Sequence, residues 1–423
     1  EPELDTGFAG QLFEHLWTMI GNRCPPTQSA AVLEDQIKER VDRVQAAVQA
    51  HLPERFADDS RVGAPDDLGV EEITVPDAHA VFAFVILAEL PPVALVGQQR
   101  IALHFVAQVQ TEAWLEQART WIGDRLAEHG LTVDGEIEQT RVRPWSTQLV
   151  APTADGPAWF KAGCPSMAFE PALHLALAEL APAEVDRPLG TDPGRGWILT
   201  RDRGQTLAAT RPPTTVDWAR VVRDSARLQR RLRDHRERLL ATGLPDRPPA
   251  SAPERFDTLL AGLRSLPPTH PSYLTGREEQ AFAGRRGRVV EAAAAITEAG
   301  LPLSMQHGDL HPNNVLLVDD DLRVFDFGDA LWGCALEVLR VPQAMIEEQP
   351  EVVADTVLEA YVEGWEGDLD LADVRRLWDD VSIVWAVGRA ETWFGAVQDA
   401  PRASLADWGV AARHHLGWAL GLE

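Results

Sequence analysis

The residues best suited to chemistry lie in the stretch MQHGDLHPNNVLLVDDDLRVFDFGDA in the last third of the chain. The apolar run 315–318 predicts a strand, which a tight acidic turn connects to a returning strand at 322–327. A hairpin this short brings Asn314, just before the first strand, close to Asp326, near the end of the second. Asp309 adds a carboxylate five residues before Asn314. Because Mg²⁺ prefers a few hard oxygen ligands together with phosphate oxygens and water, the stretch predicts a magnesium–nucleotide site.

This stretch resembles the catalytic segment of the aminoglycoside phosphotransferase/choline kinase-like family, a branch of the protein-kinase-like fold. The family's pattern is His-Gly-Asp, an Asn five residues after the Asp, and a later hydrophobic-Asp-Phe/Trp-Gly, and every position is met here. The resemblance implies that Asp309 is the catalytic base, that Asn314 and Asp326 hold the metal, and that His307 braces the loop. Asp and Asn are common in turns, so a buried hairpin with incidental polar residues is the alternative. All four residues at the family's spacing argue against it.

A lysine far upstream supplies a second part of the expected site. The chain has 39 basic residues, of which only Lys38 and Lys161 are lysines, and Lys161 lies on a predicted strand, 158–161. A helix with Glu170 in its first turn follows. By resemblance, Lys161 would meet the α- and β-phosphates of a nucleotide and pair with Glu170. The alternative for Glu170 is an acidic residue that stabilises a helix N-terminus.

The segment that would cover the phosphates departs from the protein-kinase pattern. No G-x-G-x-x-G precedes Lys161, a feature that the phosphotransferase family often lacks as well. Ser146 and Thr147, at the start of the preceding strand, are candidates to reach the nucleotide, although Ser and Thr are commonplace there. Further on, the apolar strand 197–200 corresponds by position to the strand that leads into the interlobe hinge.

The backbone of that hinge would bond the adenine edge in similar proteins. Leu199, Thr200 and Arg201 are therefore the candidate hinge residues, with Gly204 just beyond them.

In similar enzymes the acceptor lies between the catalytic loop and the helices that follow the metal motif, so we expect it to bind there in this protein.

The residues proposed as acceptor contacts share a place at or after the metal motif: Asp329, Arg389, Glu391 and Trp393. A tryptophan at helical spacing is more often a core residue than a ligand contact.

The expected fold is α+β and two-lobed, as in protein kinases. A small β-rich lobe and hinge would span 139–204, and a helical lobe with the catalytic loop would span 205–423. Residues 1–138 would form a further α+β domain, with strands at 80–90 and 100–109 and then a helix. That domain contains no recognisable metal cluster, nucleophile or phosphate loop, so its role stays open between regulation, a substrate lid and dimerisation.

Composition narrows the class of protein. The net charge of −26 disfavours nucleic acid and anionic membrane surfaces as partners, because basic patches carry affinity for both. No apolar run reaches eighteen residues, and the N-terminus shows no basic region followed by an apolar core. Three widely spaced cysteines argue against a disulfide framework. We therefore expect a cytoplasmic protein, and the sequence does not define its oligomeric state.

The expected reaction is transfer of a phosphoryl group from ATP, with Mg²⁺, to a hydroxyl group of a small molecule. The acceptor could be an aminoglycoside or another antibiotic, an amino sugar, or a metabolite such as choline or homoserine, and the acidic charge favours an amine-bearing one. A catalytically silent nucleotide-binding regulator is the alternative from another class. The retained Asp309 argues against it, since a silent protein has no need of a base. A protein kinase is not supported, because no activation loop with a phosphosite follows the metal motif.

Overall fold

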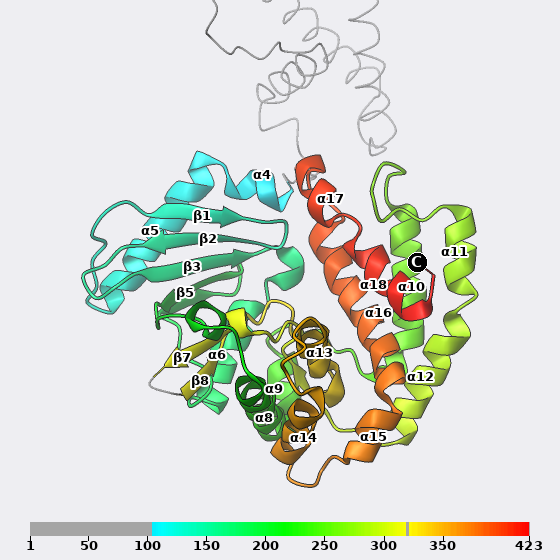
Figure 1. Cartoon of the computed structure of the whole chain (residues 1–423). Helices are drawn as coiled ribbons and strands as arrows, with labels where there is room; N and C mark the ends of the chain where they lie inside the picture. Colours follow the sequence, from blue (N-terminus) through cyan, green and yellow to red (C-terminus); the bar gives the residue numbers. More distant parts are fainter. Residues whose placement is uncertain (1–103, 319–320, 423) are drawn as a thin grey trace, which may run out of the picture. The chain divides into compact units, whose positions relative to one another are not determined.

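A five-stranded antiparallel sheet forms the first lobe of the protein (Figure 1). The computed structural model describes residues 104–318 and 321–422. The sheet has the order β1-β2-β3-β5-β4, and its neighbouring strands are all antiparallel. The strands span Glu138–Val142 (β1), Ser146–Ala151 (β2), Ala158–Gly163 (β3), Gly190–Asp192 (β4) and Trp197–Arg201 (β5). The predicted domain at the N-terminus lies outside the described residues up to position 103.

Two helices precede the sheet, and the second packs against it. They are α4 (Phe105–Val109) and α5 (Glu112–Glu128). The apolar side of α5 presents Trp114 and Trp121 to Phe160 of β3 and Trp197 of β5, with ring centroids 5.6–6.1 Å apart across the interface. These helices belong to one compact unit that begins at Leu103, so the boundary predicted at residue 138 is about one helix pair too late. The sequence indicated the helix correctly but not the surface that its aromatic side chains cover.

The strand predicted at 100–109 is wrong in its described part. Phe105–Val109 is helical, and His104 caps this helix by accepting a hydrogen bond from the backbone N–H of Ala107 at its Nδ1. A short apolar run suits a strand or a helix equally, and here a local side-chain cap stabilises the helix.

The second lobe is helical, as predicted, and carries two small two-stranded sheets. The β6–β9 pair joins Leu303–Gln306 to Leu331–Cys334, and the β7–β8 hairpin joins Val315–Val318 to Asp321–Val324. The hairpin pairs Val315 with Val324, in agreement with the predicted return of the chain.

Helix α6 (Glu170–Leu180) lies between β3 and β4 in the sequence, and α7 (Leu207–Thr210) follows β5. The main helices of the second lobe are α8 (Thr215–Leu232), α9 (Arg236–Leu240), α10 (Ala252–Ser265), α11 (Gly276–Ala283), α12 (Arg286–Glu298), α13 (Arg340–Glu347), α14 (Ala354–Gly364), α15 (Leu371–Arg376), α16 (Trp378–Val397), α17 (Arg402–Trp408) and α18 (Ala411–Leu420). Within the described residues, no helix is both long and apolar enough to span a bilayer.

One buried residue ties the core of this lobe to the strand that leads into the catalytic loop. The side-chain amide of Gln229, on α8, donates to the carbonyl oxygens of Met305 and Ala335. The hydroxyl of Tyr361, on α14, donates to the Gln229 side-chain oxygen at 2.7 Å. Since a buried polar group without a partner is costly, this network fixes β6 relative to both helices.

The packing of α5 on the sheet gives a stability prediction. Trp121→Ala should lower the free energy of unfolding by about 3–5 kcal/mol, because it removes a large buried ring from an aromatic cluster. Urea denaturation measures this loss, and hydrogen exchange should show faster opening of β3 and β5. Gln117→Ala, an exposed change on the same helix, is the matched control. Unchanged exchange in both strands of the Trp121 variant would contradict the assignment of α5 to this lobe.

Candidate active site

The loop after β6 contains the predicted base and is held by His307. The Nε2 atom of this residue lies 2.9 Å from the carbonyl oxygen of Phe325, and its Nδ1 accepts from the backbone N–H of Asp309. The ring is therefore a neutral tautomer, and burial lowers its pKa. Gly308 has φ +78°, and a Cβ there would lie 2.1 Å from the carbonyl oxygen of Asp329, so only glycine fits. His307 thus contacts the backbone on both sides of the hairpin rim, and its bracing role stays a prediction.

The Asp309 carboxylate is surrounded by hydrogen-bond donors. Its Oδ1 lies 3.1 Å from Nη2 of Arg389, and its Oδ2 lies 3.2 Å from Nε2 of His311. Burial raises the pKa of Asp309, but the hydrogen bond from His311 and the charge of Arg389 outweigh it and lower the pKa to about 2. The carboxylate is therefore ionised at neutral pH and able to accept a proton.

The hairpin brings the two predicted metal ligands to one rim, beside Asp309. The backbone N–H of Phe325 donates to the carbonyl oxygen of Asn314 at 3.2 Å, so Asp326 follows directly at this rim. The Asn314 amide nitrogen donates to the carbonyl oxygen of Asp309 at 2.9 Å, which leaves the amide oxygen as the ligand atom. Asp326 has φ +66°, a strained conformation for a residue that is not glycine. Strain of this kind is common at functional sites.

Lys161 joins the two lobes at the same rim. Its Nζ lies 2.6 Å from Oε2 of Glu170 and 2.6 Å from Oδ1 of Asp326. The other oxygen of Glu170 accepts from the backbone N–H of Phe327 at 3.0 Å. Burial lowers the pKa of Lys161, but the two carboxylates outweigh it and raise the pKa above its usual value. The predicted pairing of Lys161 with Glu170 is present, and Asp326 completes a three-residue cluster.

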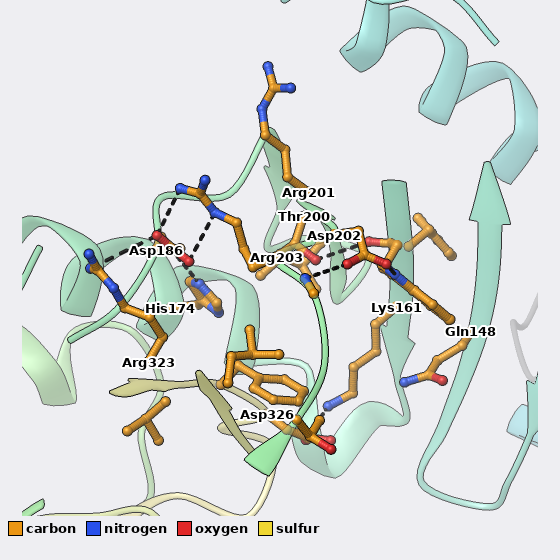
Figure 2. Close-up of a pocket in the computed structure, with 18 of the residues that line it drawn as sticks. Gln148, Lys161, His174, Asp186, Thr200, Arg201, Asp202, Arg203, Arg323 and Asp326 are labelled. Atoms are coloured by element: carbon orange, nitrogen blue, oxygen red, sulfur yellow. Dashed lines mark hydrogen bonds and ion pairs between the residues drawn. The ribbon is translucent and has the colours of Figure 1, made fainter. Parts of the chain in front are cut away.

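A cavity of about 280 Å³ opens beside this cluster, between the sheet and the hairpin (Figure 2). Ile198 lines it from the sheet, and Leu316, Val324 and Phe325 line it from the hairpin side. The chain that leaves β5 forms one wall with five consecutive residues, 200–204. The cavity thus combines apolar walls with a charged cluster at its end, a combination common in ligand-binding sites.

Two of the predicted nucleotide contacts do not line the cavity, and the side chain of a third faces the core. Ser146 and Thr147 are fully buried and do not line the cavity, and the Thr147 hydroxyl donates to the carbonyl oxygen of Arg141 at 2.8 Å. Leu199 is also fully buried, in the aromatic core under α5. Side chains alternate between the two faces of a strand, so the side chain of Leu199 faces the core and that of Thr200 faces the cavity. Arg201, at the end of β5, also lines the cavity. The hinge predicted at 199–201 concerns backbone atoms, so the burial of the Leu199 side chain leaves that prediction open.

Several lining residues were not predicted. Gln148 stands next to Lys161 in the sheet, and their side chains extend on the same side (Figure 2). Asp186 lies further along the wall, where the guanidinium groups of Arg203 and Arg323 approach it at 3.0 Å and 4.0 Å. Alternation along a strand predicts which residues of β3 project on the same face as Lys161. Which residues of the neighbouring strands project on that face depends on strand register, and no local signal in the sequence gives the register.

A second, smaller cavity of about 70 Å³ lies on the other side of Asp309. Asp329, Arg389 and Trp393, three of the predicted acceptor contacts, line it together with Trp145. The Arg389 guanidinium bridges the two carboxylates, with Nη1 at 2.6 Å from Oδ1 of Asp329.

The fourth predicted acceptor contact is directed away from this cavity. Glu391 pairs with Arg247 and Arg255, at 3.4 Å and 2.5 Å. Because i and i+2 on a helix point in different directions, Glu391 does not share the face of Arg389 on α16.

The side-chain oxygens of Asn314 and Asp326 suit Mg²⁺ better than a metal that takes all of its ligands from the protein. Among the described residues, no three His, Cys, Asp or Glu side chains gather into a metal-binding group. Asn314 and Asp326 therefore offer only a few oxygen ligands. Mg²⁺ is commonly bound by one or two carboxylates together with phosphate oxygens and water, so these residues fit it.

The chain matches a known protein family over the segment that contains this site. Residues 164–371 match the model of the phosphotransferase enzyme family. This segment, slightly less than half of the chain, is similar to that family, in agreement with the resemblance seen in the sequence. A search of curated proteins finds no significant match.

Solved structures show the same fold at low sequence identity. The ethanolamine kinase of Plasmodium vivax aligns over 73% of this chain and 89% of its own, with 11% identity and a TM-score of 0.52. A macrolide 2'-phosphotransferase type I aligns over 71% and 97%, with 15% identity and a TM-score of 0.47. A choline/ethanolamine kinase family protein from Mesorhizobium loti aligns over 73% and 94%, with 17% identity and a TM-score of 0.46. The likeness to the Plasmodium vivax kinase, together with the sheet lobe and the helical lobe, confirms the predicted two-lobed, kinase-like fold.

His174 gives the site a pH-dependent contribution to stability. Burial lowers its pKa to about 4, against an ordinary value near 6.5, while its Nε2 is bonded to the carbonyl oxygen of Asp186. Below about pH 6.5 the unfolded chain takes up a proton that the folded chain does not. The stability is therefore complete above pH 6.5 and falls, by up to about 3 kcal/mol, as the pH decreases to about 4.

Unfolding measured by urea between pH 7 and pH 4 tests this expectation. The native protein should lose about 3 kcal/mol more than His174→Gln over this range. His235→Gln, a change at a partly exposed histidine, serves as the control and should follow the native protein. Parallel curves for the native protein and the His174 variant would contradict the neutral, buried state of this ring.

Proposed function

We propose that this protein transfers the γ-phosphoryl group of ATP, with Mg²⁺, to a hydroxyl group of a small molecule. The observation that carries the proposal is the position of Lys161, 2.6 Å from both Glu170 and Asp326, at the end of a cavity that also reaches the hinge. The match to the phosphotransferase family supports it.

The cavity suits a nucleotide in one orientation. Ile198 on one side and Leu316 on the other would enclose the base, and the backbone after Thr200 would bond its edge. Lys161 then lies toward the phosphates, where its ammonium would neutralise part of their charge. Use of ATP as the donor is consistent with the cytoplasmic location expected from the sequence.

Asn314 and Asp326 would hold the metal. The chemistry that Mg²⁺ would supply there is positive charge to balance the charge of the phosphates. The two ligands are fixed before binding, because Asn314 is bonded to the Asp309 backbone and Asp326 is paired with Lys161. A site formed in advance limits the ordering cost of binding.

Asp309 would orient the acceptor hydroxyl and take up its proton. Its low pKa makes it a weak base but keeps it ionised, and phosphoryl transfer depends more on positioning than on base strength. His311 and Arg389 hold the carboxylate toward the smaller cavity.

The smaller cavity favours an amine-bearing acceptor, such as an aminoglycoside or an amino sugar. Asp309 and Asp329 bring two negative charges there, against one positive charge from Arg389. Trp145 and Trp393 supply aromatic walls, on which a cationic group or a sugar ring packs favourably.

Replacement of Asp309 separates catalysis from nucleotide binding. Asp309→Asn should lower kcat by at least about 100-fold and change the Kd for ATP little, because the base acts on the acceptor. The measurement is an ATP-consumption assay with a panel of aminoglycosides, amino sugars, macrolides and amino alcohols, followed by calorimetric binding of ATP. Asp407→Asn, an exposed change on α17, is the control.

Two outcomes would count against the proposal. Unchanged turnover in Asp309→Asn would exclude its role as the base. A native protein that binds ATP with Mg²⁺ but phosphorylates no acceptor and hydrolyses no ATP would instead favour a silent nucleotide-binding regulator.

Metal dependence gives a separate test. Native protein should bind ATP more tightly with Mg²⁺ than with EDTA, and Asp326→Asn should reduce that difference about tenfold or more, because the charged ligand is lost. Titration calorimetry under both conditions measures it. An Asp326 variant that keeps the full effect of Mg²⁺ would show that the metal binds elsewhere.

A further inference from the structure

The connection between β1 and β2 lacks the glycine-rich loop that covers nucleotide phosphates in protein kinases. It has only three residues, 143–145, with the sequence Arg-Pro-Trp. The backbone N–H of Arg143 donates to the carbonyl oxygen of Ser146 at 2.8 Å, so the turn closes on itself. A turn with no glycine and a bonded backbone offers few N–H groups to a phosphate, and a side chain has to supply the missing contact.

The register of the sheet identifies a candidate side chain. Arg141 of β1 is directly opposite Gln148 of β2, Gln148 is opposite Lys161 of β3, and Lys161 is opposite Ile198 of β5. Residues paired in this way project from the same face of a sheet. Because the last three line the nucleotide cavity, Arg141 stands on the cavity face, two strands beyond Lys161.

The charge of Arg141 faces the cluster at the rim of the cavity. Burial lowers its pKa, and the carboxylates of Asp326 and Glu170 act in the opposite direction, so its guanidinium feels both groups. Its Nη2 lies 3.5 Å from the Ser146 hydroxyl oxygen, at the limit of a hydrogen bond. The hydroxyl predicted to reach the nucleotide is thus turned toward this arginine instead.

Arg141 differs from the other buried cations of the site in having no ionic partner. Lys161 is neutralised by two carboxylates, and Arg389 is neutralised by two others. Within residues 104–318 and 321–422, no carboxylate pairs with Arg141, and its buried Nε has no hydrogen-bond partner. A partly buried guanidinium without an ionic partner is costly unless an anion binds it.

The position of Arg141 in the chain also relates it to the acceptor side. Four residues later, Trp145 lines the smaller cavity together with Asp309. The segment 141–145 therefore runs from Arg141, on the face of the sheet that lines the nucleotide cavity, to Trp145, in the wall of the acceptor cavity. The phosphoryl group has to pass between these two cavities.

We propose that Arg141 binds the γ-phosphate of the nucleotide and stabilises it during transfer, in place of a glycine-rich loop. This inference rests on the proposed function. As the bond between phosphorus and the ADP oxygen breaks, the electron pair leaves with ADP. The acceptor oxygen forms the new bond to phosphorus, and its proton goes to Asp309. Arg141 keeps its protons and donates hydrogen bonds to the phosphoryl oxygens, whose charge it balances.

The test compares ATP and AMP, which differ in the phosphates that Arg141 would contact. Arg141→Ala should weaken ATP binding, measured by calorimetry with Mg²⁺, about tenfold or more and leave AMP binding unchanged. It should also lower kcat more than it raises the KM for ATP. Arg141→Gln keeps the stem of the side chain and provides a second variant, and thermal denaturation verifies the fold of both. Arg143→Ala, the same charge change at an exposed arginine in the turn that follows β1, should alter neither affinity.

The outcomes separate this inference from the proposed function. A native protein without Mg²⁺-dependent ATP binding would overturn the proposed function itself. Native binding of ATP with equal affinity in both Arg141 variants would overturn only the role of Arg141. Equal weakening of ATP and AMP would also overturn it, since that pattern indicates a structural effect. An equal loss in Arg143→Ala would do the same, since it indicates a nonspecific effect of charge.

Discussion

The arrangement of the site depends on one buried ammonium group held between two carboxylates. Lys161 brings β3 of the first lobe within 2.6 Å of Glu170 at the start of α6 and of Asp326 after β8. Removing these charges from water costs several kcal/mol for each ion, and the cost is offset only when the geometry of the pairs is good. The cluster therefore fixes three segments that are distant in sequence, and with them the end of the nucleotide cavity.

A second set of alternating charges organises the acceptor side. Arg389 lies between Asp309 and Asp329, and His311 holds the other oxygen of Asp309. Because each carboxylate keeps a donor, the base stays ionised although it is buried. The two clusters meet at the hairpin rim, where Asn314 is bonded to the Asp309 backbone. The two cavities, which we propose bind the nucleotide and the acceptor, are thus positioned by one continuous set of polar contacts.

The difference between predicted and observed contacts has a common physical origin. Lys161, Asp309, Asn314 and Asp326 were predicted from residue types at a specific spacing, and the structure places them at one rim. Ser146 and Thr147 were assigned by position along the chain, and both are buried away from the cavity. Whether such side chains reach the cavity depends on which face of the strand packs on the core. A shift of one residue in strand register moves each side chain to the opposite face. The helix Glu112–Glu128 was recognised as a helix but assigned to the wrong domain, because its aromatic partners on the sheet follow much later in the chain.

The sequence by itself determined the class of fold, the catalytic loop and the chemistry of its side chains, since the motif is local and its spacing constrains the backbone. Only the tertiary structure decided what stands beside that motif. It paired Lys161 with Asp326 across 165 residues, and it aligned Arg141 and Gln148 with Lys161 through strand register. It also enclosed the acceptor cavity between Trp145 and Trp393. These relations arise from packing between distant segments, which no local pattern of residue types encodes.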